Sequence, residues 1–298
     1  MTIQLRGLVA ATHTPFRADG ELNLSAIEKQ AEHLHNNGVK IVFIGGTTGE
    51  SHSLTLEERR ALTQRWCEVA RGTELKVIVH VGANCLGDAR TLAAQAQSLG
   101  AIAIAALAPS YFKPRSIDVL VACCAEIASA APETPFYYYD IPSLTGINLP
   151  SADFLTQAAD KIPTLAGLKF TNPDLMAYQL CLRAGDGQWD VPFGVDEHCL
   201  GGLAMGAKGA VGSGFNFAAP IYQRMLKTFA AGDLATARVE QFCGVQLIEL
   251  FASYGYMGAA KAAMQMLGVD VGPARLPNTS LTPERFKELR GKLETLTP

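Results

Sequence analysis

Short runs of apolar residues recur along the chain and alternate with segments in which apolar residues return at helical spacing. Uninterrupted apolar runs are typical of strands buried on both faces, and a spacing of three or four residues is typical of amphipathic helices. The runs predict eight strands, at residues 7–14, 39–44, 75–81, 101–107, 135–139, 165–171, 191–194 and 208–212.

Helices are expected between these strands, and the end of the chain is expected to contain helices only. The pairs Ser25–Glu28 and Thr55–Glu58 have the spacing of capping boxes, which open helices. After about residue 218 only helices are expected, and Thr282 and Pro283 suit the N-cap and first position of the last one. The helices predicted there cover residues 222–231, 234–254 and 257–267, followed by the helix that starts at Thr282.

Eight buried strands that alternate with helices predict a parallel sheet covered on both faces. Such a sheet can close into a (β/α)8 TIM barrel or stay open as a doubly wound sheet. Polar and glycine-rich clusters follow the strand ends, where barrel enzymes carry their chemistry, and this favours the barrel. We therefore expect a single α/β domain, with a barrel over residues 1–217 and C-terminal helices packed on it over residues 218–298.

Composition narrows the class of protein. With 48% hydrophobic and 18% charged residues, the 298-residue chain resembles an ordinary soluble globular protein. The net charge of -3 comes without a lysine/arginine run, so neither nucleic acid nor membrane is an expected partner. No signal peptide is visible and no apolar run reaches about 18 residues, which predicts a cytoplasmic protein. The seven cysteines contain no C-x-x-C pair and are expected to be reduced thiols.

Lys169 stands near the end of an otherwise apolar strand, in the run Leu-Ala-Gly-Leu-Lys-Phe-Thr of residues 165–171. A lysine there either turns its ammonium to water or is held as a neutral amine, which is a nucleophile for a carbonyl carbon. The sequence alone leaves both possibilities open.

Three further clusters follow strand ends. Residues 45–50, Gly-Gly-Thr-Thr-Gly-Glu, lack the lysine of a P-loop; they suit either a carboxylate-binding nest or a turn without a ligand. Tyr137, Tyr138 and Tyr139 end the fifth strand; since side chains alternate, Tyr139 is expected on the face of Lys169, where its phenol could move a proton or only pack.

Asp196 and Glu197 follow the seventh strand and offer two adjacent carboxylates. They could hydrogen-bond the hydroxyls of a polyol, complement a helix dipole, or bind a metal together with His198 and Cys199. A metal is disfavoured because no second ligand cluster is present in the sequence, and a role for His198 and Cys199 stays open. Ser213, in a glycine-rich segment after the eighth strand, adds a hydroxyl.

Five of these stretches resemble, in order and spacing, the family of class I pyruvate lyases and synthases that includes dihydrodipicolinate synthase and N-acetylneuraminate lyase. The matching stretches are residues 11–16, 45–50, 139–142, 167–169 and 206–213. The resemblance implies a (β/α)8 barrel in which Lys169 forms a Schiff base with a 2-keto acid, without cofactor or metal. It implies that Thr47 and Thr48 bind the carboxylate, that Tyr139 transfers a proton, and that Thr48 and Tyr111 belong with Lys169 and Tyr139 to the catalytic residues.

The resemblance also implies a homo-oligomer, a tetramer or dimer, because Tyr111 matches an aromatic residue that reaches the site of a neighbouring subunit. Dihydrodipicolinate synthases have arginine where this chain has Leu144, and an apolar residue cannot bind their second carboxylate. The pattern of Gly194, Asp196 and Glu197 is similar to that of the sialic-acid-cleaving members instead, in which these residues bind the polyol tail together with positions matching Thr171 and Ser213.

The resulting expectation is reversible aldol cleavage of N-acetylneuraminate to N-acetylmannosamine and pyruvate. Three alternatives remain: a related lyase or dehydratase acting on another 2-keto-3-deoxy sugar acid, a non-catalytic barrel that binds a keto acid, and a metal-dependent aldolase. Asp140 stands where several family members have asparagine or histidine, so the exact sugar stays open.

Overall fold

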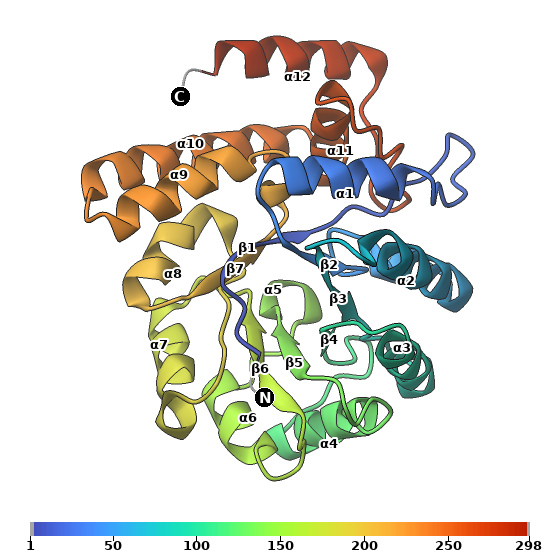
Figure 1. Cartoon of the computed structure of the whole chain (residues 1–298), viewed down its shortest axis with the longest axis vertical. Helices are drawn as coiled ribbons and strands as arrows, with labels where there is room; N and C mark the ends of the chain where they lie inside the picture. Colours follow the sequence, from blue (N-terminus) through green and yellow to red (C-terminus); the bar gives the residue numbers. More distant parts are fainter. Residues whose placement is uncertain (1–2, 297–298) are drawn as a thin grey trace. The chain divides into compact units, whose positions relative to one another are not determined.

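A computed structural model describes residues 3–296 of the chain (Figure 1). It consists of two compact parts, which are described in turn. The first part contains the chain up to Val9 and from Lys76 to Val211, and the second contains residues from Ala10 to Leu75 and from Gly212 onward. The expectation of a single domain stays a prediction.

The first part is built on parallel strands that follow one another in chain order. They are β3 (Lys76–His80), β4 (Ala103–Ala106), β5 (Phe136–Asp140) and β6 (Leu165–Phe170), with each strand paired to the next. Every residue of β4, β5 and β6 is buried, as expected for a parallel sheet covered on both faces. In this register Tyr139 lies opposite Lys169.

The strand predicted at residues 191–194 is only partly formed. Instead of a continuous strand, Asp190 bridges Gly167, and Phe193 bridges Phe170 and Ala210, all in parallel. Pro192 lies between them and has no backbone N–H to donate, so the ladder is interrupted there. The bridges still connect β6 to β7 (Gly209–Gly212), the strand predicted at residues 208–212.

Helices surround the strands of the first part, and α3, α4, α6 and α7 lie outside them in Figure 1. The helices are α3 (Leu86–Ser98), α4 (Ile117–Ala128), α5 (Pro142–Thr145), α6 (Ser151–Ala158), α7 (Leu175–Arg183) and α8 (Cys199–Met205), with 3-10 turns at Ala184–Gly187 and Asp196–His198. Side-chain caps start two of them: Ser116 accepts a hydrogen bond from the Val119 N–H, and Asp174 accepts from the N–H groups of Met176 and Ala177.

The second part contains the end of β1 (Gly7–Ala11), β2 (Ile41–Ile44) and the remaining helices. The N–H of Thr12 donates to the carbonyl of Phe43 at 3.1 Å, which ties the segment after β1 to β2. The helices are α1 (Ala26–Asn36), α2 (Leu56–Ala70), α9 (Ala219–Ala230), α10 (Leu234–Ser253), α11 (Tyr256–Met266) and α12 (Pro283–Thr295), with 3-10 turns at Ser51–Ser53 and Gly214–Asn216.

The helix starts of the second part test three predicted caps. The capping box of Thr55 and Glu58 is present at the start of α2, and Thr282 caps α12 with Pro283 at the first position, as predicted. The box predicted at Ser25 is wrong: Ser25 has helical φ and ψ of -69° and -20°, whereas an N-cap residue needs an extended backbone to present its oxygen. Its hydroxyl donates to Asn23 instead.

The C-terminal helices share an apolar core. Phe251, Ala259, Ala260 and Leu289 are fully buried in it, and Phe217 packs against it from the segment before α9. The C-terminal helices predicted after residue 218 are therefore present. Among the helices within residues 3–296, none has both the length and the hydrophobicity needed to cross a membrane. All seven cysteines are free.

Candidate active site

Lys169 lies on β6 with its side chain in the protein interior, only 5% exposed, so it does not extend into water. The strand around it depends on Gly167, whose φ is +156°. A Cβ at this position would lie 1.7 Å from the carbonyl oxygen of Asp190, so only glycine allows the two backbones to approach. This approach fixes β6, and with it the lysine, against the segment at residues 190–193.

Tyr139 lies opposite Lys169 on the neighbouring strand, as the alternation of side chains predicts. The Nζ atom of Lys169 is above the Tyr139 ring, 4.0 Å from its centroid. His80 from β3 contacts the same ring edge-on, with centroids 5.7 Å apart. Tyr138 takes the opposite face and packs on Phe154 of α6. The amine and the phenol-bearing ring are therefore brought together; the contact of His80 was not predicted, because no local pattern marks it.

Asp140 follows Tyr139 and is buried. Burial raises the pKa of its carboxyl to about 6, and a hydrogen bond with the Ser151 side chain opposes the rise. Its backbone carbonyl accepts a hydrogen bond from the N–H of Thr171 at 2.8 Å. This bond links the end of β5 to the first residue after β6.

Thr171 and Gly194 lie against each other where the ends of two strands meet. A Cβ on Gly194 would lie 2.1 Å from Oγ1 of Thr171, and the Gly194 N–H donates to the Phe170 carbonyl at 2.7 Å. The Thr171 Oγ1 atom is buried and has no hydrogen-bond partner among residues 3–296. A buried hydroxyl without a partner is costly, so this atom has a hydrogen bond to offer to a polar ligand.

The two carboxylates after Gly194 occupy a 3-10 turn, Asp196–His198, which runs directly into α8. Asp196 is buried and Glu197 is half-buried. His198 is exposed and Cys199 is buried, where burial raises the pKa of its thiol, so the two side chains differ in their access to solvent. Among residues 3–296, no group of three or more His, Cys, Asp or Glu side chains is arranged to hold a metal ion.

Tyr111 lies outside this group of residues, on a turn before α4. Its side chain is 80% exposed and packs edge-on against Phe112, which is also exposed. Asn84 holds the turn, because its Oδ1 accepts hydrogen bonds from the N–H groups of Ser110 and Tyr111 at 2.9 and 3.0 Å. Leu144, on α5, is exposed as well.

The second part carries Thr47 and Thr48 in the glycine-rich loop after β2, and both are half-buried. The loop folds back on itself, since the N–H of Glu50 donates to the Thr47 carbonyl at 2.9 Å. The hydroxyl of Thr14, beyond the end of β1, donates to the Gly49 carbonyl at 2.6 Å and braces the loop from the side.

Ser213, also in the second part, makes a hydrogen bond with a residue that sequence reasoning missed. Its Oγ lies 2.7 Å from the phenol oxygen of Tyr256, the first residue of α11. The two residues are 43 positions apart in the chain, and no motif connects them.

Comparisons with known proteins agree with these observations. Residues 4–296 match the model of the "Dihydrodipicolinate synthetase family". N-acetylneuraminate lyase A of Xenopus laevis is 42% identical over 92% of this chain and 90% of its own length, and N-acetylneuraminate lyase of Pongo abelii is 40% identical over 98% and 93%.

Solved structures extend the similarity to the fold. N-acetylneuraminate lyase of Proteus mirabilis superposes with a TM-score of 0.96 at 39% identity and covers 99% of both chains. Dihydrodipicolinate synthase of Cyanidioschyzon merolae, solved with lysine bound, gives a TM-score of 0.90 at 31% identity over 98% of both chains. The predicted α/β TIM barrel with C-terminal helices is thereby confirmed. The chain therefore belongs to the dihydrodipicolinate synthetase family, a family of aldolase-type enzymes.

Proposed function

We propose that this protein is a carbon–carbon lyase that cleaves N-acetylneuraminate reversibly to N-acetylmannosamine and pyruvate. The observation that carries the proposal is the buried Lys169 beside the Tyr139 ring, in a chain about 40% identical to several N-acetylneuraminate lyases over nearly its whole length. The exposed apolar Leu144 is unsuited to a second substrate carboxylate, which supports a sugar acid rather than a dicarboxylate product.

The proposed reaction starts with attack of the Lys169 amine on the keto carbon of the substrate. Loss of water gives an iminium, whose positive nitrogen accepts the electron pair released when the neighbouring carbon–carbon bond breaks. Tyr139 removes the proton of the substrate hydroxyl that becomes the aldehyde and returns a proton to the resulting enamine. Hydrolysis of the imine then releases pyruvate and restores the amine.

The remaining predicted residues bind the substrate in this proposal. Thr47 and Thr48 hold the carboxylate, while the polyol tail is bound by Thr171, Gly194, Asp196, Glu197 and Ser213. The unpartnered buried hydroxyl of Thr171 and the buried Asp196 support these roles. In this proposal the residues of the two parts come together in one site within a single domain. The proposal also includes a homo-oligomer, in which Tyr111 contributes to a neighbouring subunit's site, and a cytoplasmic location for the protein.

The test measures pyruvate released from N-acetylneuraminate by the purified chain and by Lys169→Ala. We expect release by the wild type alone. If Lys169→Ala released pyruvate as fast as the wild type, the proposal would be contradicted. If the wild type were active in a substrate panel only on other 2-keto-3-deoxy sugar acids, the protein would be a sister enzyme. Borohydride reduction in the presence of pyruvate distinguishes these two enzymes from a barrel that only binds a keto acid. Only a protein that forms an imine gains a covalent mass increment on Lys169.

A further inference from the structure

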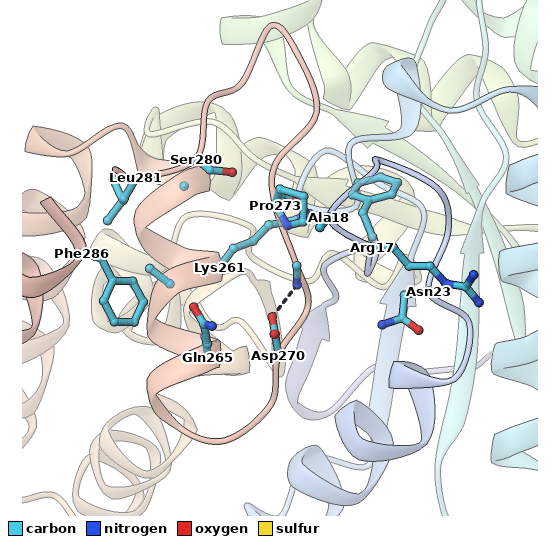
Figure 2. Close-up of a pocket in the computed structure, with 14 residues that line it drawn as sticks. Arg17, Ala18, Asn23, Lys261, Gln265, Asp270, Pro273, Ser280, Leu281 and Phe286 are labelled. Atoms are coloured by element: carbon cyan, nitrogen blue, oxygen red, sulfur yellow. Dashed lines mark hydrogen bonds between the residues drawn. The ribbon is translucent and has the colours of Figure 1, made fainter. Parts of the chain in front are cut away.

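A buried ion pair joins the glycine-rich loop to the C-terminal helices. Nζ of Lys261, on α11, lies 2.7 Å from a carboxylate oxygen of Glu50, the last residue of the loop. The two side chains are 2% and 0% exposed. Figure 2 shows the Lys261 side chain extending from α11 toward Pro273.

Both ions find further hydrogen-bond partners in the interior. Besides its ion pair with Glu50, Lys261 donates hydrogen bonds to the carbonyls of Thr14 and Pro273, at 3.0 and 2.7 Å. The second carboxylate oxygen of Glu50 accepts from the backbone N–H of Arg275 at 2.8 Å. The pair therefore connects the segment after β1, the loop after β2, α11 and the segment at residues 273–275.

The backbone of Glu50 is held in an uncommon conformation. Its φ is +54°, in the left-handed region that a residue with a Cβ seldom adopts and that costs about 1 kcal/mol or more. Such a conformation persists only where its surroundings determine it, and here the buried carboxylate is held by Lys261 and Arg275. Glu50 is two residues beyond Thr48, so its conformation sets the direction in which the loop leaves the two threonines.

Stability is a poor explanation for this pair. Two buried ions lose their hydration, and an apolar pair of similar volume is often equally stabilising or better. What the ion pair adds is a defined geometry. We propose that Glu50 and Lys261 are positioning residues, which hold the Thr47–Thr48 loop in the shape that receives the carboxylate of the keto acid. This inference rests on the proposed function for the role of the two threonines.

The experiment measures pyruvate binding through the imine. The Lys169 amine and the ketone of pyruvate lose water to give the imine, and borohydride adds hydride to its carbon, leaving a stable secondary amine. The trapped fraction, measured by intact mass against pyruvate concentration, gives a half-saturating concentration for Glu50→Gln, Lys261→Met and the double variant. Melting temperatures are measured in parallel.

Each single variant leaves one buried charge without its partner and is expected to lose stability, whereas the double variant has no unpaired charge and is expected to regain most of it. We expect the double variant to need about 10-fold more pyruvate for half-saturation while reaching the same maximum trapped fraction, because binding rather than the amine is affected. The matched control is Lys40→Met, which breaks the exposed pair of Lys40 and Glu74 in the same part of the chain and is expected to leave the titration unchanged.

A folded double variant with the half-saturating concentration of the wild type would overturn the inference. If the double variant does not fold, Glu50→Asp is measured instead, because it keeps the charge and shortens the side chain by one methylene. We expect its half-saturating pyruvate concentration to rise about 3-fold. An unchanged concentration would overturn the inference. A wild type that traps pyruvate but does not cleave N-acetylneuraminate would contradict the proposed sugar and leave this titration decisive for the ion pair. A wild type that traps no pyruvate would overturn both.

Discussion

The Nζ atom of Lys169 lies above the ring of Tyr139, 4.0 Å from its centroid, where β6 and β5 run side by side in register. The contact follows from the backbone: in a parallel pair, residues opposite each other present their side chains to the same face. The relationship therefore needs no special loop, and it keeps the amine beside the tyrosine that we propose as its proton carrier.

Replacing Tyr139 with phenylalanine keeps the ring over the amine and removes the hydroxyl. We expect kcat for cleavage of N-acetylneuraminate to fall 10²- to 10⁴-fold, the usual range for loss of a general acid–base group. Steady-state kinetics measure the effect. Tyr138→Phe is the matched control, since Tyr138 faces Phe154 on the other side of the sheet, and it should stay within about 2-fold of the wild type. Equal rates for both variants would remove Tyr139 from the mechanism.

Replacing Asp140 with asparagine should stabilise the protein at neutral pH. The folded pKa of about 6 lies above the ordinary 3.8, so the folded state keeps its proton longer, and the contribution of Asp140 to the free energy of unfolding falls as pH rises from 3.8 to 6. At about 1.4 kcal/mol per pKa unit, Asp140→Asn should gain at most about 3 kcal/mol at pH 7 and little at pH 3.5. Denaturant titrations at both pH values check this, with the exposed Asp160→Asn as control. Equal gains at the two pH values would contradict the assignment.

His13 should make the protein less stable in acid. Burial, followed by the nearby charge of Lys261, lowers its pKa to about 3, while the unfolded chain binds a proton near 6.5. The contribution of His13 to the free energy of unfolding therefore falls as pH drops from 6.5 toward 3, by up to about 1.4 kcal/mol per pH unit. His13→Gln should remove this slope, and the exposed His35→Gln should keep it. Denaturant midpoints measured from pH 7 to pH 4 test this prediction. If the midpoints of the wild type and of His13→Gln changed with pH in parallel, the prediction would be refuted.

Adding a methyl group at Gly194 should strain the junction with Thr171. The new Cβ would lie 2.1 Å from Thr171 Oγ1, so Gly194→Ala is expected to lose about 1–3 kcal/mol of stability. Adding Thr171→Ala removes the clashing oxygen and should recover part of the loss. Gly87→Ala, where the nearest atom would be 3.7 Å away, is the control and should be close to neutral. Thermal melts of the wild type and the three variants measure the effect, and a double variant no better than Gly194→Ala would exclude the clash.

Much of the fold could be predicted because the strands are continuously apolar and their helices carry local start signals. The cap at Thr282 and the capping box at Thr55 are set by residues three positions apart, so sequence was sufficient there. It was insufficient at Ser25, where the preceding residues already turn into the helix, and at Pro192, where one missing N–H interrupts an otherwise apolar strand.

In the candidate site, too, local features could be predicted from the sequence and contacts between distant residues could not. Lys169 and Tyr139 were predictable as neighbours because strand alternation and chain order place them together. The contacts of Ser213 with Tyr256 and of Glu50 with Lys261 join residues far apart in the chain, and neither residue of such a pair carries a local mark of the other. The sequence motif identified the glycine-rich loop but could not reveal what supports it.

The support of that loop limits how short a working version of this protein can be. Lys261 and Arg275 lie well beyond the last strand, yet both contact carboxylates from the first quarter of the chain. Lys261 forms an ion pair with Glu50, and Arg275 donates its backbone N–H to Glu50 and forms an ion pair with Glu58. A gene truncated after β7 would encode every predicted catalytic side chain and still lack Lys261 and Arg275, the two residues that hold the Glu50 carboxylate. The smallest functional fragment should therefore extend past Arg275, and it should keep α12 as well, because Leu289 of that helix is fully buried in the core of the C-terminal helices.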